Sequence, residues 1–183
     1  MSFDREDYKL YDIDVVIKNQ PLFVEQCNVL HKLIQQSVGD DDTTRAYKRY
    51  NIFQISASSL AFYKLYCEVI KNVRDYVGDD RPLWMSGWMN FHQPMQVLNW
   101  HNHLNSICHG YVSIDPKDTT TDFKDYAIEN QVGRLYLGPS ARLHKVVVNK
   151  PFAGHRITIG FDVSDDQDCL LVQSGDYNFL PIP

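Results

Sequence analysis

Three histidines fall within nine positions of one short segment, NWHNHLNSICHGYVSI at residues 99–114. The chain has seven histidines in all, so His101, His103 and His109 form a local concentration. If this segment is a strand, residues two apart point to the same side, and His101 and His103 share a face. Their ring nitrogens could then converge on one transition-metal ion at about 2.0–2.2 Å. Two hydrogen-bonded histidines on a half-buried strand fit the same H-x-H pattern, and both interpretations stay open at this point.

His109 lies six residues beyond His103. This even offset would put it on the same face of a continuous strand, but about 20 Å farther along. A turn within residues 104–108 would bring it near. His109 is therefore a candidate to replace His103 as a metal ligand, or else a residue that lies behind the site or faces the substrate.

His144 is the candidate third ligand. It follows GRLYLGPSARL at residues 133–143, which is typical of a strand, a Gly-Pro turn and the beginning of a second strand. In a jelly roll, a residue that enters a late strand lies beside the end of an early one. A set of three histidines would leave other coordination positions open. The alternative is a partly exposed histidine at a strand edge.

Arg156 stands in HRITIGFDV (155–163), a segment that otherwise indicates a buried strand. A buried guanidinium needs an anion, and its planar fork suits a carboxylate. Thr158 would share its face and could add a hydroxyl. A structural salt bridge to an Asp or Glu is the alternative.

The surrounding sequence predicts helices first and strands afterwards. Two helices are expected at about 21–39 and 56–78, each closed by a glycine, with core-facing stripes of Leu22, Val29, Leu30, Leu33 and Ile34 and of Leu60, Tyr63, Cys67, Ile70, Val73 and Val77. From Trp84 the period changes to two, which predicts strands at 83–91, 95–103, 109–115, 132–138, 144–149 and 155–163. Segments such as PKDTTTD (116–122) indicate turns between them. We expect a mainly β fold, a double-stranded β-helix (jelly roll) covered by N-terminal α-helices.

The length of 183 residues favours one domain. Within 1–183 we expect a helical support at about 20–80, a β-helix core at about 84–163 and a C-terminal tail at 164–183. The apolar, proline-ended DYNFLPIP (176–183) is expected to lie on a neighbouring surface of this chain or of a partner.

Motifs over residues 84–163 resemble those of the Fe(II)- and 2-oxoglutarate-dependent oxygenases. The likeness rests on WMNFHQPMQVLNWHNHLNSICHGYVSIDP, GRLYLGPSARLHKV and GHRITIGFDV, and it is nearest to the small group with an early H-x-H motif. The resemblance implies an enzyme that couples decarboxylation of 2-oxoglutarate, its co-substrate, to oxidation of a substrate C–H bond, with hydroxylation as the usual outcome.

Carried over by position, the resemblance implies that His101, His103 and His144 hold Fe(II). Arg156 and Thr158 would anchor the far carboxylate of 2-oxoglutarate. Most of that superfamily has a carboxylate where this chain has His103, and a neutral three-histidine set would leave bound iron its full charge. This departure bears on reactivity more than on binding. Tyr111 and Asn90 are further candidate co-substrate pocket residues, with a purely structural role as the alternative.

A second resemblance is to the cupins. Gly133, Pro139, His144 and Asn149 are spaced as in the later cupin motif, but Ile107 and Cys108 stand where the early cupin motif usually has a glutamate. This interpretation predicts a metalloenzyme or metal-binding protein that does not use 2-oxoglutarate. A metal-free β-helix binding module is the third possibility.

Composition limits the partners. A formal net charge of −5 argues against duplex nucleic acid, and no apolar run approaches the about 18 residues of a membrane span. Four dispersed cysteines favour reduced thiols and a cytoplasmic location. We expect a small-molecule or peptide substrate, whose identity the sequence leaves open, as it does the oligomeric state.

Overall fold

The structure is a computed structural model that describes residues 7–38, 44, 46–94, 96, 98–104, 106–165 and 179–183. Its helical elements are α1 (Asp14–Val38), η1 (Tyr47–Arg49), α2 (Ile52–Ile55) and α3 (Leu60–Val77). Its strands are β1 (Lys9–Asp12), β2 (Leu83–His92), β3 (Cys108–Asp115), β4 (Thr119–Phe123), β5 (Ala127–Glu129), β6 (Arg134–Pro139), β7 (His144–Val148), β8 (Arg156–Ser164) and β9 (Leu180–Ile182).

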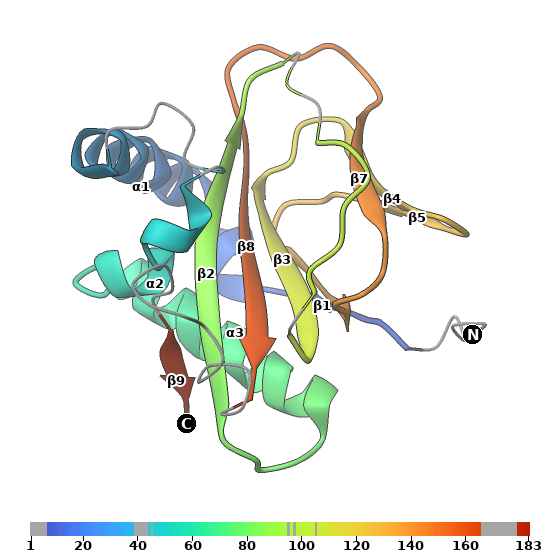
Figure 1. Ribbon diagram of the computed structural model, residues 1–183. Helices are drawn as coiled ribbons and strands as arrows, with labels where there is room; N and C mark the ends of the chain where they lie inside the picture. Colours follow the sequence, from blue (N-terminus) through green and yellow to red (C-terminus); the bar gives the residue numbers. More distant parts are fainter. Residues whose placement is uncertain are drawn as a thin grey trace.

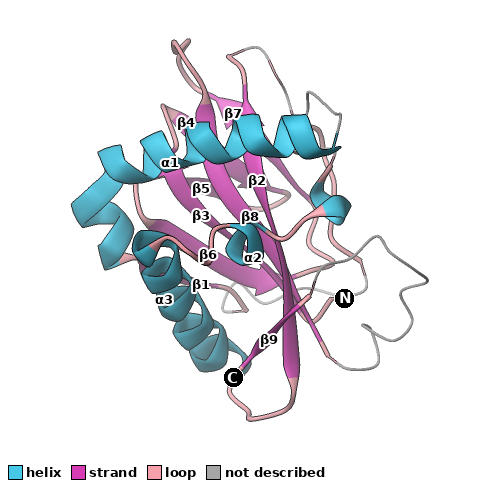
Figure 2. Ribbon diagram, turned by 90° about the vertical axis from the view of Figure 1, so that its left-hand side faces the viewer, coloured by secondary structure: helices cyan, strands magenta, loops and turns pink. Residues whose placement is uncertain are grey.

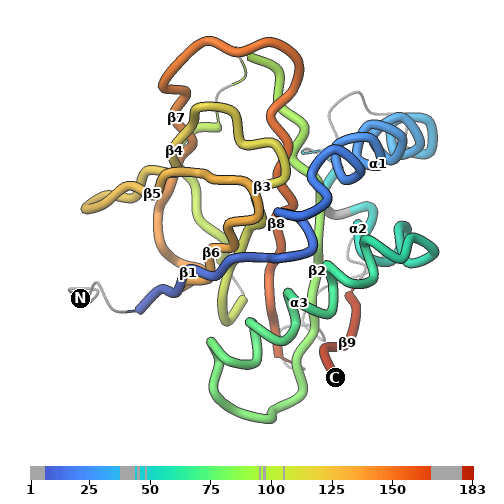
Figure 3. Tube along the Cα trace, turned by 180° about the vertical axis from the view of Figure 1, so that it is seen from behind, coloured from blue at the N-terminus to red at the C-terminus, as the bar shows by residue number. Residues whose placement is uncertain are grey.

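The strands form two antiparallel sheets with the order β1-β6-β3-β8-β2-β9 and β5-β4-β7. The small sheet lies on one side of the large sheet, and the helices lie on the other (Figures 1 and 3). Viewed from the helical side, α1 and α3 cross in front of the large sheet (Figure 2). This is the expected double-stranded β-helix, a jelly roll covered by N-terminal helices.

Alternation along β2, β3 and β8 gives the large sheet one apolar face and one polar face. Toward the helices it buries Met85, Met89, Phe91, Val112, Ile114, Ile157, Ile159, Phe161 and Val163. Toward the small sheet it presents Asn90, His109, Tyr111, Arg156, Thr158 and Asp162. Because side chains of a strand alternate with a period of two, the burial of the first set positions the second.

Helix α3 ends where expected, but its buried stripe matches the predicted one only in part. Ser59 caps α3 by accepting from the Phe62 backbone N–H, and Gly78 closes it at φ 77°. The face of α3 that meets the core holds Phe62, Leu65, Val69 and Val73, whereas Leu60 and Tyr63 of the predicted stripe are exposed. The prediction holds for Val73, and for Ile70 and Val77, which pack partly buried against the core. It was wrong for Leu60 and Tyr63, because two stripes have nearly the same spacing and contacts with the sheet select between them.

Helix α1 shows the same correction. It begins at Asp14, before the predicted start, and continues past Pro21 with non-helical backbone at Asn19. Phe23, Cys27 and Ile34 are buried, and Phe23 packs on Phe62 of α3 with ring centroids 5.4 Å apart. Leu22, Val29 and Leu33 of the predicted stripe are 42–54% exposed. The predicted end at Gly39 lies outside the described residues.

The strand predictions hold for β2, β3, β6, β7 and β8 within two residues. The predicted strand at 95–103 is wrong: its described residues are irregular, apart from one bridge at His101. The segment 116–122, read as a turn, contains β4 instead, in keeping with the β-branched side chains of its threonines.

The C-terminal residues Leu180–Ile182 pair with β2 of the same chain as β9. The division into support, core and tail at the predicted boundaries stays a prediction. No described helix is both long enough and apolar enough to cross a membrane.

Candidate functional site

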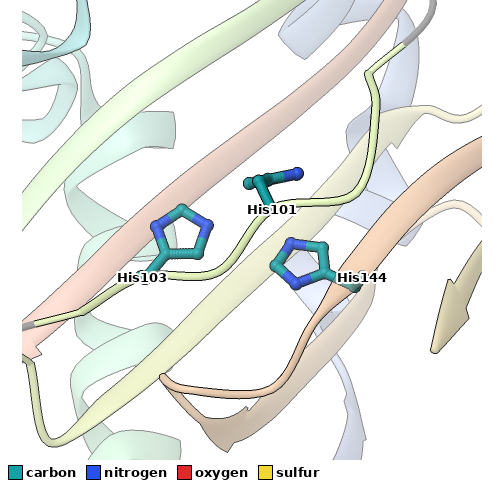
Figure 4. A group of neighbouring side chains, drawn as sticks. All are labelled: His101, His103 and His144. Carbon is teal, nitrogen blue, oxygen red and sulfur yellow. The ribbon is translucent and has the colours of Figure 1, made fainter. Parts of the chain in front are cut away.

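The structure brings His101, His103 and His144 together (Figure 4). His144 begins β7 and forms an antiparallel bridge with His101, the backbone N–H of each residue donating to the carbonyl of the other at 2.9–3.0 Å. One nitrogen from each ring lies within 4.8 Å of the others. The strand argument for the pairing of His101 and His103 therefore fails, because this segment is irregular, yet the two rings still meet.

Each of the three rings is held through Nδ1. His101 Nδ1 lies 2.8 Å from the Asn99 carbonyl oxygen, and His144 Nδ1 lies 3.1 Å from that of Arg142. His103 Nδ1 lies 3.2 Å from the carboxylate of Asp162. Since all three partners are acceptors, each Nδ1 carries the proton and each Nε2 keeps a free lone pair. His103 Nε2 is buried and has no hydrogen-bond partner in the structure as described.

Burial favours neutral imidazoles at this position. It lowers the pKa of His101, and together with the charges of His109 and His101 it lowers that of His144 to about 2. Neutral nitrogens with free lone pairs are the form that binds metal. Imidazole donors suit zinc, copper, iron and nickel.

His109 lies beside His103, not about 20 Å away. The chain turns between the two residues, and their rings stack at a centroid distance of 3.7 Å. Its Nδ1 donates to Asp162 at 2.9 Å, and burial with the charge of His103 lowers its pKa to about 4. A second potential metal group therefore comprises His103, His109 and Asp162.

Asp162 is a site residue that the sequence analysis missed. It accepts hydrogen bonds from Nδ1 of both His103 and His109. Burial alone would raise its pKa, but these two histidines hold the pKa below its usual range. Its position could have been found, because an offset of six from Arg156 on one strand gives the same face.

Arg156 is buried, with 3% of its surface exposed. Its Nη1 donates to His92 Nδ1 at 2.9 Å, and its Nε has no hydrogen-bond partner in the structure as described. No carboxylate of the described residues forms an ion pair with it, so the predicted alternative of a structural salt bridge has no counterpart there. Burial lowers its pKa to about 10, which leaves the guanidinium charged at neutral pH.

The remaining predicted pocket residues surround Arg156 on the same face of the sheet. Thr158 Oγ1 accepts from Asn90 Nδ2 at 3.1 Å, and Asn90 Oδ1 accepts from Trp88 Nε1 at 3.1 Å. The Tyr111 hydroxyl is buried without a hydrogen-bond partner among the described atoms, and burial raises its pKa. Asn90 and Tyr111 stand on β2 and β3, the two neighbours of β8.

One cavity of about 430 Å³ connects the two groups of residues. The histidines, Arg156, Thr158, Asn90 and Tyr111 all line it, within the size range of small-molecule pockets. Trp88 also lines it and stacks on His103 at a centroid distance of 5.5 Å. Gly160 makes room for that indole, since a Cβ there would lie 2.8 Å from Trp88 Cε2. The sequence analysis missed His92 as well, because only the β2–β8 register pairs it with Arg156.

Comparison with known proteins identifies relatives by structure alone. No family model matches the sequence, and no curated protein matches it. The non-haem α-ketoglutarate-dependent carbocyclase SnoK from nogalamycin biosynthesis is similar over 100% of this chain and 97% of its own, with 11% identity and a TM-score of 0.64. HygX from Streptomyces hygroscopicus, crystallised with nickel and 2-oxoglutarate, is similar over 97% and 98%, with 13% identity and a TM-score of 0.61.

A prolyl-4-hydroxylase from Pseudomonas putida is similar over 88% of this chain and 89% of its own, with 10% identity and a TM-score of 0.53. At such low identity these likenesses show a shared fold. The structural neighbours thus include an α-ketoglutarate-dependent carbocyclase and a prolyl-4-hydroxylase, and what they share with this chain is the fold.

Proposed function

We propose that this chain is an Fe(II)- and 2-oxoglutarate-dependent dioxygenase of the H-x-H type, with hydroxylation of a substrate C–H bond as its reaction. One juxtaposition carries the proposal. Three imidazoles with free Nε2 atoms and a buried guanidinium without a carboxylate partner among the described residues line the same cavity. The first group suits a divalent metal, and the second suits a carboxylate.

The residues present fit the metal. His101, His103 and His144 would hold it through Nε2, because each Nδ1 is already bound to an acceptor. The orphaned Nε2 of His103 is the atom that most needs such a partner, since a buried nitrogen without a hydrogen bond is unfavourable. Bound iron would supply dioxygen activation, and oxidative decarboxylation of 2-oxoglutarate would supply two of the four electrons that reduce dioxygen, with the substrate C–H bond giving the other two.

The residues around Arg156 fit a dicarboxylate. Arg156 would bind its far carboxylate, and the Thr158 and Tyr111 hydroxyls, which line the same cavity, would donate to that group. His92 directs the guanidinium by accepting from Nη1, and Asn90 orients the Thr158 hydroxyl. Burial of this end of the cavity excludes water and strengthens the ionic contact.

The ligand set departs from the pattern with a carboxylate at the position of His103. Three neutral histidines leave the charge of a divalent ion uncompensated by direct ligands, which favours an anionic chelator. HygX, a neighbour in fold, has been crystallised with iron and with nickel and 2-oxoglutarate, which is consistent with this chemistry.

We further propose a small-molecule or peptide substrate and a cytoplasmic location, and we expect no duplex nucleic acid or membrane partner. A cavity of about 430 Å³ is large enough for a co-substrate and a compact group of a second molecule.

Anaerobic titration of the iron(II)-loaded protein with 2-oxoglutarate tests the function. A visible charge-transfer band that saturates is the expected result, and Arg156→Met should abolish it while iron stays bound. Iron binding without a band and without 2-oxoglutarate affinity would refute the proposal in favour of a cupin-type metalloprotein. If the protein bound no divalent metal, the three histidines would have a structural role instead.

A further inference from the structure

Asp162 forms a bridge between two stacked imidazoles behind the proposed metal position. His103 and His109 lie nearly parallel, at an interplanar angle of 8°, and both direct Nδ1 at this carboxylate. The carboxylate is largely buried, with 19% of its side chain exposed, and no Lys or Arg among the described residues forms an ion pair with it. A largely buried carboxylate that accepts from two imidazole N–H groups, without a Lys or Arg beside it in this part of the structure, favours a cation nearby.

The stacking geometry favours hydrogen bonds over a second metal ion at this carboxylate. Imidazole lone pairs lie in the ring plane, so two parallel rings 3.7 Å apart cannot both aim Nδ1 at an ion placed between their planes. Two N–H donors converging on one carboxylate need no such alignment. Among the described residues, His103 is then the ring that belongs to both groups and links Asp162 to His101 and His144.

The charges in the cavity support a link between Asp162 and the proposed metal position. With three neutral histidines, a divalent ion and Arg156 bring positive charge, and a bound dicarboxylate brings two negative charges. Asp162 contributes the remaining negative charge, so that the cavity is neutral overall when occupied. A carboxylate hydrogen-bonded to the far nitrogen of a histidine ligand also fixes its tautomer and raises its basicity.

We propose that Asp162 is a positioning residue for the metal. By accepting from Nδ1 of His103, it turns Nε2 of His103 toward the ion and supplies, one imidazole away, the negative charge that the three-histidine set lacks. His109 shares this carboxylate and fixes its orientation without binding the ion. The inference rests on the proposed function only in requiring a divalent metal at the three histidines.

The test measures Zn(II) and Co(II) affinity by competition with a chromophoric chelator, on wild-type protein and on Asp162→Asn. The amide has the shape of the carboxylate but no charge, and we expect metal affinity to fall about 10- to 100-fold. The visible spectrum of bound Co(II) should shift as well. The matched control is Asp118→Asn, which removes an exposed carboxylate paired with Lys150 and should leave both readouts unchanged.

The substitution His109→Gln distinguishes the role of His109 from that of His103. Since Gln can still donate to Asp162, metal affinity should stay within about threefold of the wild type, whereas loss comparable to that of a ligand variant such as His101→Ala would overturn the proposal. Unchanged Zn(II) and Co(II) affinity in Asp162→Asn would overturn it too. Absence of metal binding by the wild type is a different failure, because it refutes the proposed function and this inference with it.

If Asp162→Asn fails to fold, a measurement on the wild-type protein tests the same proposal. In Zn(II)-loaded protein with 15N-labelled histidine, the imidazole nitrogen shifts should show His103 with a protonated Nδ1 and a metal-bound Nε2. A metal-bound Nδ1 at His103 would overturn the proposal.

Discussion

The substitution Arg156→Met separates the proposed role of this guanidinium from a structural one. Met keeps most of the length of the side chain but removes its charge and its donors. A bidentate contact with the co-substrate would comprise two charge-assisted hydrogen bonds of about 1.5–3 kcal/mol each. Their loss should weaken 2-oxoglutarate binding at least about 100-fold, by the relation between free energy and Kd. Metal affinity should change little, because in the described part of the chain the Arg156 guanidinium hydrogen-bonds to His92 and not to the three proposed histidine ligands.

The same substitution should not weaken the apo fold much. Arg156 is a buried charge with no ion-pair partner in the described part of the chain, so removing it relieves a desolvation penalty of several kcal/mol. The loss is one hydrogen bond to His92 Nδ1, worth about 1–3 kcal/mol when its buried partner is left unsatisfied. We expect the free energy of unfolding to fall by less than about 1 kcal/mol or to rise.

Arg142 provides the matched control, because it is a buried arginine that does have a partner. Its Nη2 lies 2.6 Å from an Asp7 carboxylate oxygen, and its Nη1 donates to the Tyr126 hydroxyl at 2.6 Å. Arg142→Met should therefore destabilise the fold by about 3 kcal/mol, the lower end for breaking a buried pair, since the Asp7 side chain is 27% exposed.

Urea unfolding of both variants and isothermal titration with 2-oxoglutarate on the metal-loaded proteins give the required data. The expected pattern is a loss of binding without a loss of stability in Arg156→Met, and a loss of stability in Arg142→Met. If Arg156→Met is the more destabilised variant, or if it binds 2-oxoglutarate as the wild type does, the assignment of Arg156 to an anion is wrong.

Three further outcomes follow from the site. His101→Ala removes one of the three proposed ligands and should therefore lower Zn(II) affinity at least about 100-fold. The titration uses Zn(II) alone, without 2-oxoglutarate. The free energy of unfolding of the metal-free protein should decrease as the pH falls from 6.5 toward 4, because the pKa of His109 is lowered to about 4 and the unfolded chain takes up the proton first. His109 alone should contribute about 3 kcal/mol over this range, so His109→Gln should make the dependence in urea unfolding shallower by that share, while the lowered pKa values of His101 and His144 maintain the rest. Gly160→Ala should displace the Trp88 indole and destabilise the fold by about 1–3 kcal/mol, with altered Trp fluorescence.

Each of these outcomes has a contrary result. Wild-type Zn(II) affinity in His101→Ala would remove that residue from the ligand set. An equally steep pH dependence in His109→Gln would assign the titration to other groups. Gly160→Ala with unchanged stability and fluorescence would mean that the indole has space to move.

The sequence was sufficient where a short-range pattern determines the structure. Period-two alternation predicted β8 and hence the common face of Arg156 and Thr158, and Gly78 predicted the C-terminal end of α3. The sequence was insufficient where the pairing of strands determines the structure. The irregular segment around His101 was read as a strand because its composition is strand-like, and the partner of Arg156 on β2 could not be known without the register.

The position of His109 shows why its sequence offset of six from His103 was misleading as a measure of distance. A distance along a strand assumes that the strand is continuous, and the turn between residues 103 and 108 breaks that assumption. Asp162 was overlooked for a related reason. An aspartate in a buried strand has a clear role only when its partners are known, and its partners come from the irregular segment and from β3.

The two ends of the cavity are positioned by different means, and this difference has a consequence. Arg156 and Thr158 stand on β8, a central strand paired along its length with β2 and β3, and the apolar side chains on its other face fix its register. His101 and His103 instead lie on irregular backbone held by the bridge to His144 and by hydrogen bonds from Nδ1. The proposed dicarboxylate end is therefore preorganised by the core itself, whereas the proposed metal end depends on a few local hydrogen bonds. Metal binding should stabilise the segment around His101. The Asp162 carboxylate on β8 is one contact that joins this segment to the large sheet, beside the Ile107 N–H that donates to the Val163 carbonyl oxygen.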